Sequence, residues 1–320
     1  MKAMQFCLAA VLGACAAAAA WAGGYPEHPI RMVVPFPAGS TTDTMARFLA
    51  EKVAPELGQT VIVENRAGAQ GGIAAAEVSR AKPDGYTLLV GTNSTQSANV
   101  HLFKKLPYDP AADFAAITQF SMNPLVLVIR PDLPVHTLPE FIDYARERPG
   151  KLNYGTGNSG SLAAAQMLKS MAGIEALDVP YAGTPQAITD LIAGRLDFMI
   201  TDISVTRPYI EAGKLRALGV TTARPVGSLP DTPTLAQAGL PGYEFVAWGG
   251  LFAPAGTPEA VVARLNEVFV QALRSPAAGE FFAKQGLEPA PRTPGDFTRY
   301  VTAQTSLWGK LLADAGQVKQ

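Results

Sequence analysis

The segment with the clearest chemistry is residues 33–43, where a β-branched strand pattern runs into a turn of small residues and then into an amphipathic helix. Its sequence is VVPFPAGSTTD, and no Lys or Arg stands between Arg31 and Arg47. The first N–H groups of a helix have no partner within the helix, and the helix dipole favours negative charge there. This pattern is typical of a site that holds a carboxylate reversibly without a fixed cation. The residues expected to supply its amides and hydroxyls are Phe36, Ala38, Gly39, Ser40 and Thr41.

A second strand end of the same kind lies near the middle of the chain. Residues 155–161 are GTGNSGS, and an apolar helical pattern follows them. Glycine lets the backbone approach a ligand closely, and a serine can cap the helix while its first amides face outward. One such loop has a structural explanation, but two of them predict a ligand held in a cleft between two lobes. The expected contacts here are Gly157, Asn158, Ser159, Gly160 and Ser161.

Three further strand ends carry residues that could line the same cleft. The candidates are Asn93, the run Tyr181-Ala182-Gly183-Thr184, and Asp202. Ligands of open α/β sheets bind beyond the carboxyl ends of the strands, which is where these residues stand. Asp202 could accept a hydrogen bond from a ligand amine or hydroxyl, or it could cap a helix.

No catalytic set can be assembled from the sequence. Serine hydrolases carry Gly-x-Ser-x-Gly, and GNSGS at 157–161 lacks the last glycine. The three histidines, His28, His101 and His136, are expected to be ordinary surface or packing residues rather than catalytic bases. The sequence has no histidines paired at helical spacing and no carboxylate cluster of the calcium type, so it predicts no metal site. Neither glycine-rich run fits a dinucleotide site. We therefore expect a protein that is not an enzyme and that uses no metal or cofactor.

Charge and cysteine content narrow the class of protein further. The formal net charge is −1 and the basic residues do not cluster, so a nucleic-acid partner is not expected. Residues 1–22 are predicted to be a signal peptide, with an apolar run from Phe6 to Ala20 and cleavage after Ala22. The segment ending at Cys15 also fits a lipoprotein signal, and this alternative stays open. Type I cleavage would leave no cysteine in the mature chain.

Strand and helix patterns alternate along the chain, which is typical of a mostly parallel sheet covered by helices. The expected strands are 30–35, 60–64, 87–91, 125–129, 153–156, 178–180, 198–201, 215–221 and 245–253. The expected helices are 44–57, 73–80, 138–148, 162–172, 186–193, 208–212, 259–273 and 296–315. A chain of 320 residues exceeds what one core usually organises, so two α/β units are predicted, with the C-terminal helices returning to the first.

The chain also carries many short motifs in a fixed order. They include VPFPAG at 34–39, VENR at 63–66, KPDGYTLL at 82–89, LPYDP at 106–110, NYG at 153–155, VPY at 179–181, GKLRAL at 213–218, PGY at 241–243 and APAGTP at 253–258. Each motif is weak alone, but together they are specific and cover nearly the whole chain after the leader. In them the chain resembles the tripartite tricarboxylate transporter substrate-binding family, extracytoplasmic receptors often called Bug proteins.

This resemblance implies an α/β fold of the two-lobed type II periplasmic binding protein class, with a ligand cleft between the lobes. Lobe 1 would comprise residues 23–123 and 249–320, and lobe 2 residues 124–248. The implied function is that of a monomeric periplasmic solute-binding protein. It would close on a small carboxylate, such as a di- or tricarboxylate, an amino acid or an aromatic acid, and deliver it to membrane permease subunits of a tripartite tricarboxylate transporter.

In the family, one ligand carboxylate is held by the loops at the starts of two helices, which map onto 36–41 and 157–161. Other contacts map onto the loops around Asn93, 181–184 and Asp202. The chain departs from the family pattern at Gly39-Ser40, where many relatives have two glycines, and at the start of the second-lobe helix. Two alternatives stay open: a ligand-sensing receptor that feeds a two-component signalling system, and a secreted enzyme that acts on small acids.

Overall fold

The computed structural model of the chain describes residues 24–314 and 319. The predicted signal peptide at 1–22, with Cys15 and the cleavage position after Ala22, lies outside the described residues. Among the described helices, none is both long enough and apolar enough to cross a membrane.

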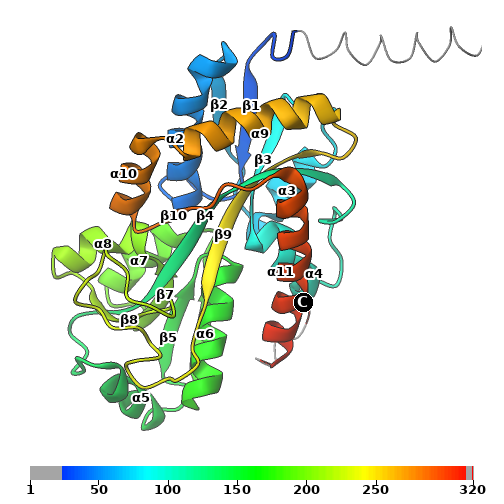
Figure 1. Cartoon of the computed structure of the whole chain (residues 1–320). Coiled ribbons are helices and arrows are strands. Elements are labelled where there is room, and N and C mark those ends of the chain that lie inside the picture. Colours follow the sequence, from blue (N-terminus) through cyan, green and yellow to red (C-terminus); the bar gives the residue numbers. More distant parts are fainter. Residues whose placement is uncertain (1–23, 315–318, 320) are drawn as a thin grey trace, which may run out of the picture.

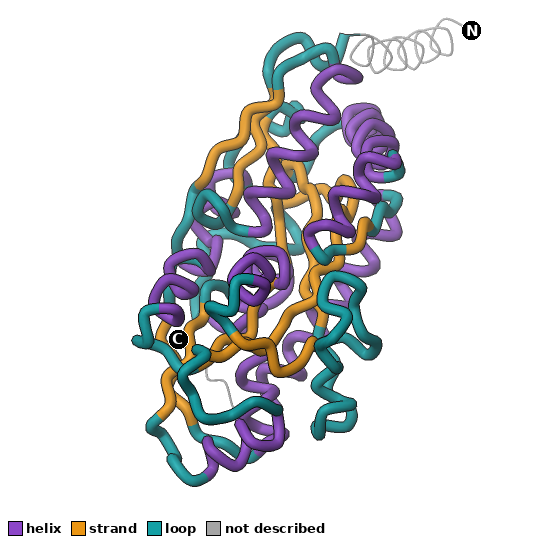
Figure 2. Tube along the Cα trace, turned by 90° about the vertical axis from the view of Figure 1, so that its left-hand side faces the viewer, coloured by secondary structure: helices purple, strands orange, loops and turns teal. Residues whose placement is uncertain are grey.

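One continuous sheet of ten strands runs through the molecule and changes its pairing half-way along the strand β4 (Phe114–Ile129). The first part of β4 pairs antiparallel with β9 (Val246–Pro254), and its last part pairs antiparallel with β7 (Phe198–Asp202) and β8 (Arg216–Val220). We call the half of the sheet around β9, with its helices, lobe 1, and the half around β7 lobe 2. The lobes form the upper and lower parts of the molecule (Figure 1), which is elongated in the side view (Figure 2).

Each lobe contains a set of parallel strands. In lobe 1, β1 lies between β2 and β3, and β9 runs antiparallel beside β3. In lobe 2, β5 lies parallel between β6 and β7. The bounds of these strands are β1 Ile30–Val34, β2 Val61–Asn65, β3 Thr87–Thr92, β5 Leu152–Thr156 and β6 Ala176–Pro180. A two-residue strand, β10 (Glu288–Pro289), pairs with β4.

Helices cover both faces of each half of the sheet, as expected for parallel strands joined by helical crossovers. In lobe 1, α2, α9 and α10 pack on one face and α3 and α11 on the other. In lobe 2, α5 and α6 pack on one face and α7 and α8 on the other. Their bounds are α2 Thr41–Leu57, α3 Gly72–Val78, α5 Leu138–Arg146, α6 Ser159–Ala172, α7 Thr184–Ile192, α8 Ile203–Glu211, α9 Glu259–Leu273, α10 Pro276–Gln285 and α11 Pro294–Asp314. The short helices are η1 Ala69–Gly71, η2 Ser94–Ala98 and α4 Asn99–Leu102.

The structure departs from the predicted elements where buried polar residues or proline hide the pattern. β4 begins at Phe114 rather than at residue 125, because its first part carries buried polar side chains such as Gln119 and Ser121. The helices at 94–102 were not expected, since Ser94, Thr95, Gln96 and Ser97 are polar yet buried on every face of the helix. Helix α8 begins at Ile203, so Pro208 lies inside it rather than near its start.

Helix α11 packs on both lobes. Near its start, Phe297 contacts Trp248 and Phe252 on the face of lobe 1. Near its end, Trp308 is 2% exposed and packs edge to face on Phe245, with ring centres 5.4 Å apart. Phe245 belongs to the apolar core of lobe 2. The helix therefore crosses the boundary between the lobes along one side of the molecule (Figure 1).

Substitution of Trp308 by alanine tests this contact. We expect Trp308→Ala to lower the free energy of unfolding by about 3–5 kcal/mol, because it leaves a cavity beside Phe245. Leu307→Ala is the matched control, since Leu307 precedes Trp308 on the same helix and is 54% exposed. Urea denaturation of both variants measures the difference. Equal losses for the two variants would show that the end of α11 is not anchored in lobe 2.

Candidate functional site

The loop that leads into α2 is held by the side chains at the start of the helix. Gly39 has a φ of +79°, which favours glycine, and its amide donates to Asp43 Oδ2 at 3.0 Å. Ser40 is the N-cap, and its Oγ accepts from the amide of Asp43 at 3.3 Å. The amide of Gly39 is therefore occupied within the loop, although the sequence analysis expected it to face outward unpaired.

Asp43 connects this loop to the neighbouring strand β2. Its carboxylate accepts from Arg47 and from Asn65 Nδ2, and Asn65 also donates to the carbonyl of Phe36 at 2.9 Å. Burial alone would raise the pKa of Asp43, but Arg47, the Gly39 amide and Asn65 together hold the pKa below its ordinary value. Asp43 is thus a charged anchor that fixes the shape of the loop.

The loop that leads into α6 carries a capping box. Asn158 Oδ1 accepts from the amide of Ser161 at 2.9 Å, and Ser161 Oγ accepts from the amides of Gly157 and Asn158 at 3.0 and 3.2 Å. Ser159 donates its amide to Ser94 Oγ of lobe 1 at 3.2 Å. Most of the predicted amides of this loop therefore have partners inside the protein.

Four amides at these two helix starts have no hydrogen-bond partner among residues 24–314. They belong to Ala38, Thr41, Thr42 and Gly160. A helix start with such amides is suited to an anion, because the free N–H groups and the helix dipole act in the same direction. The caps give the loops their shape and leave these four amides without a partner among the described residues.

The two lobes contact each other at these helix starts, along what we call the seam, which is formed by Pro37, Thr41, Asn93, Gly160, Gly183 and Ser204. The start of α6 meets Asn93: a Cβ built on Gly160 would lie 3.3 Å from Asn93 Nδ2 and 3.7 Å from Ala247 Cβ. Asn93 is 4% exposed, and its Nδ2 has no partner among the described residues. A buried donor thus lies beside the free amide of Gly160.

The start of α7 meets the loop of α2 across the seam. A Cβ built on Gly183 would lie 2.4 Å from Pro37 Cδ, so only glycine fits this contact. A Cβ on Gly157 would lie 2.4 Å from the backbone nitrogen of Thr184, which places the starts of α6 and α7 against each other. Gly157 and Gly183 therefore allow the loops before α2, α6 and α7 to lie in close contact.

The start of α8 meets the start of α2. The hydroxyls of Thr41 and Ser204 are 2.6 Å apart, and one donates to the other. Asp202 stands at the N-cap position of α8, 6% exposed, and its side chain makes no capping hydrogen bond. Burial raises the pKa of Asp202 to about 6, although the Thr41 hydroxyl and its own amide oppose the shift. The seam therefore contains a buried carboxyl at the starts of α2 and α8.

Of the predicted site residues, Thr41, Asn93, Gly160 and Gly183 belong to the seam, and Gly157, Thr184 and Asp202 lie beside them. Tyr181 and Ala182 contribute least, because the Tyr181 hydroxyl donates to Asp190 within lobe 2 and Ala182 is exposed. The sequence analysis missed Ser94 and Asn99, which accept from the amide and the hydroxyl of Ser159, and Ser204, which contacts Thr41. Ser94 and Asn99 lie in short helices without an amphipathic pattern. Ser204 could have been found, since it follows Asp202 by two residues.

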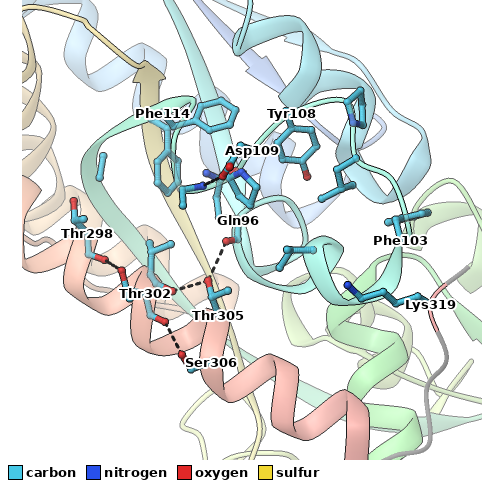
Figure 3. Close-up of a pocket in the computed structure, with 18 of the residues that line it drawn as sticks. Gln96, Phe103, Tyr108, Asp109, Phe114, Thr298, Thr302, Thr305, Ser306 and Lys319 are labelled. Carbon is cyan, nitrogen blue, oxygen red and sulfur yellow. Dashed lines mark hydrogen bonds between the residues drawn. The ribbon is translucent and has the colours of Figure 1, made fainter.

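Within residues 24–314, no group of three His, Cys, Asp or Glu residues could hold a metal ion. A separate surface cavity of about 810 Å³ lies between α11 and residues 103–114, where Phe103, Tyr108 and Phe114 line it (Figure 3). None of the predicted site residues lines this cavity.

Residues 45–317 match the model of the tripartite tricarboxylate transporter family receptor. The chain belongs to this family. Three solved structures support the assignment. R. palustris Rpa4515 with adipate has a TM-score of 0.91 and 36% identity, and the match covers 92% of this chain and 100% of that one. The periplasmic binding protein BugD has a TM-score of 0.88 and 35% identity, with coverage of 92% and 100%. MatC from Rhodopseudomonas palustris with bound malate has a TM-score of 0.85 and 35% identity, with coverage of 90% and 100%.

The receptors of this family are periplasmic binding proteins with the fold described above. The predicted family and the predicted two-lobed α/β fold are therefore confirmed. The shared fold extends over both lobes, since each of the three matches covers at least 90% of the chain.

The buried Asp202 predicts a specific pH dependence of stability. A carboxyl whose pKa is raised by folding binds its proton more tightly in the folded state, so its contribution to stability is lost as the pH rises from about 4 to about 6. Asp202→Asn removes this loss, which amounts to about 3 kcal/mol for a pKa shift of about two units. We expect the free energy of unfolding of the variant, relative to the wild type, to rise by that amount over this range in urea denaturation.

Asp231→Asn is the control for this measurement, because Asp231 is exposed in the same lobe. Its free energy of unfolding should run parallel to that of the wild type at every pH. A parallel course for Asp202→Asn as well would show that Asp202 is not buried at the seam.

Proposed function

We propose that the protein is a periplasmic receptor that captures a small carboxylate between its lobes and delivers it to a membrane permease of the tripartite tricarboxylate type. The observation that carries this proposal is the meeting of four helix starts, those of α2, α6, α7 and α8, at one seam. Each start adds partial positive charge, and the contacts described across the seam involve no Lys, Arg or His. An anion is the guest that this arrangement favours.

The free donors of the seam supply enough binding energy for this role. They are the amides of Ala38, Thr41, Thr42 and Gly160 and the side-chain amide of Asn93. A hydrogen bond to a charged group contributes about 1.5–3 kcal/mol. Three or four such bonds, less the cost of ordering the ligand and the lobes, are consistent with dissociation constants in the micromolar range or below. The structures of Rpa4515 with adipate and of MatC with malate agree with a carboxylate guest.

Closure of the lobes is the second part of the proposal. The lobes would consist of residues 23–123 with 249–320 and of residues 124–248, and they would rotate where β4 and β9 pass between them. A ligand that contacts both lobes stabilises the closed form, and the permease would dock with that form of the monomer. We also propose that the protein is exported with cleavage after Ala22 and acts by binding alone, without catalysis.

A screen of purified protein against small acids tests the proposed function. We expect at least one di- or tricarboxylate, amino acid or aromatic acid to raise the melting temperature. A ligand at 100 times its dissociation constant stabilises the folded state by about 2.7 kcal/mol. Uncharged amides of the same acids are the control, since they lack the anionic group. A screen in which no acid stabilises the protein, or in which the amides act equally well, would contradict a carboxylate receptor.

Gly183→Ala tests whether binding requires closure. The backbone of Gly183 is extended, with a φ of −178°, so alanine is accepted locally. The added methyl group would lie 2.4 Å from Pro37 Cδ and prevent the lobes from meeting. We expect affinity for the best acid of the screen to fall by about tenfold or more in calorimetry, a loss of about 1.4 kcal/mol. The unliganded protein should keep its stability.

Gly279→Ala is the matched control, because a Cβ at Gly279 on α10 meets nothing within 4 Å. It should bind with wild-type affinity. Wild-type affinity in Gly183→Ala would show that the ligand binds without the closed seam.

A further inference from the structure

The lobes also contact each other at a second place, where α8 of lobe 2 meets the end of α10 of lobe 1, on the left of Figure 1. A Cβ built on Gly286, just after α10, would lie 2.6 Å from Ser228 Oγ and 2.9 Å from Ile203 Cγ2. Ile203 is the first residue of α8 and belongs to the apolar core of lobe 2. We call this place the α8–α10 contact, which is formed by Ile203, Arg207, Ser228, Lys284 and Gly286.

The end of α10 presents a carbonyl oxygen to lobe 2. The amide of Gly286 donates to the carbonyl of Ala283, and this bond closes the last turn of the helix. The amide of Leu287 donates to the carbonyl of Phe282 in the same turn. The carbonyl of Lys284 is left without a partner in the helix. Since the carboxyl end of a helix carries partial negative charge, this carbonyl favours a cation.

Arg207 of α8 supplies that cation from the other lobe. Its Nη1 donates to the carbonyl of Lys284 at 2.7 Å. Its Nε donates to Glu211 Oε1 at 2.8 Å, one turn further along α8, and this bond orients the guanidinium. The side chain of Arg207 is 26% exposed, so the bond to α10 is partly shielded from water. A charge-assisted hydrogen bond therefore joins the two lobes at this place.

Helix α8 connects the α8–α10 contact to the seam. Ser204 and Arg207 are three residues apart on α8, and residues with this spacing are neighbours on the surface of a helix. Ser204 contacts Thr41 at the start of α2, and Arg207 contacts the end of α10. One helix of lobe 2 thus meets the start of one helix of lobe 1 and the end of another. We expect a movement of α8 that separates Ser204 from Thr41 to displace Arg207 from α10 as well.

We propose that Arg207 is a positioning residue, which holds the lobes in the closed arrangement through the end of α10 and does not contact the ligand. This inference rests on the proposed function, because it concerns the closure that capture requires. The helix starts at the seam repel one another when the closed form is empty, and the attraction between Arg207 and the negative end of α10 opposes that repulsion. When only a fraction of the molecules can bind, the apparent dissociation constant rises as that fraction falls. Arg207 therefore raises the affinity for every ligand by the same factor.

Arg207→Gln tests the inference by calorimetry with malate, succinate, adipate, glutamate and benzoate. Glutamine removes the positive charge and keeps a polar side chain. For each of these acids that binds the wild type, we expect the dissociation constant to rise about fivefold, because a cation at the end of a helix contributes about that factor. The factor should be the same for each acid. Arg207→Lys, which retains the charge, should recover most of the affinity.

Arg264→Gln is the matched control. Arg264 on α9 pairs with Glu267 on its own helix at 3.0 Å, and its Nη2 donates to the carbonyl of Glu56, in the last turn of α2, at 3.0 Å. It makes the same two kinds of contact as Arg207, but both of its helices belong to lobe 1. Arg264→Gln should therefore bind with wild-type affinity. Urea denaturation of both variants measures their stability, which a purely structural role of Arg207 would lower without a change in affinity.

The outcomes separate this inference from the proposed function. Wild-type or tighter binding by Arg207→Gln overturns the inference and leaves the carboxylate receptor intact. An equal loss of affinity in Arg264→Gln also overturns it, and so do factors that differ between the acids, which would place Arg207 against the ligand. Failure of the wild type to bind any acid, here and in the wider screen, overturns the proposed function itself and the inference with it.

Discussion

The structure depends on one electrostatic constraint: several helix starts meet at the seam, and no Lys, Arg or His of the described chain takes part in the contacts between them. Partial positive charges at close range repel, and free amides in a closed site lose their hydrogen bonds to water. Both effects disfavour an empty closed form. An anionic guest relieves both at once, because it accepts from the amides and compensates the dipoles. In the proposed function, closure of the lobes and binding of the anionic ligand therefore depend on the same interaction.

The loops at the seam are fixed by partners that lie behind them. Asp43 holds the Gly39 amide and Asn65, and Ser161 holds two amides of the α6 loop. These bonds use donors that would otherwise have been free for a ligand, but they determine where the remaining donors lie. A loop that is already ordered loses less conformational entropy when its ligand binds, which favours affinity.

The sequence predicted the two-lobed α/β fold and the strand-to-helix loops at 36–41 and 157–161, because these depend on local patterns. Glycine and serine after β1 and β5 mark a strand end and a cap wherever they occur. The sequence did not predict the occupied amides, since the Ser161 hydroxyl can face a ligand or its own loop, and only packing decides. The contact of Ser94 with Ser159 was also missed, because the helix that carries Ser94 is buried and has no amphipathic pattern. Contacts between distant segments, such as that of Thr41 with Ser204, depend on how the two lobes pack against each other.

Helix α11 restricts how the lobes can move apart. Its start packs beside Trp248 in lobe 1, and its end reaches the core of lobe 2 through Trp308. A helix that packs on both lobes restricts how the two lobes can rotate about a hinge. If α11 rotates with lobe 1, the rotation axis must pass near Trp308. Otherwise α11 must shift along the surface of lobe 2. The proposed opening of the lobes is therefore restricted to fewer directions than it would be if β4 and β9 alone joined them.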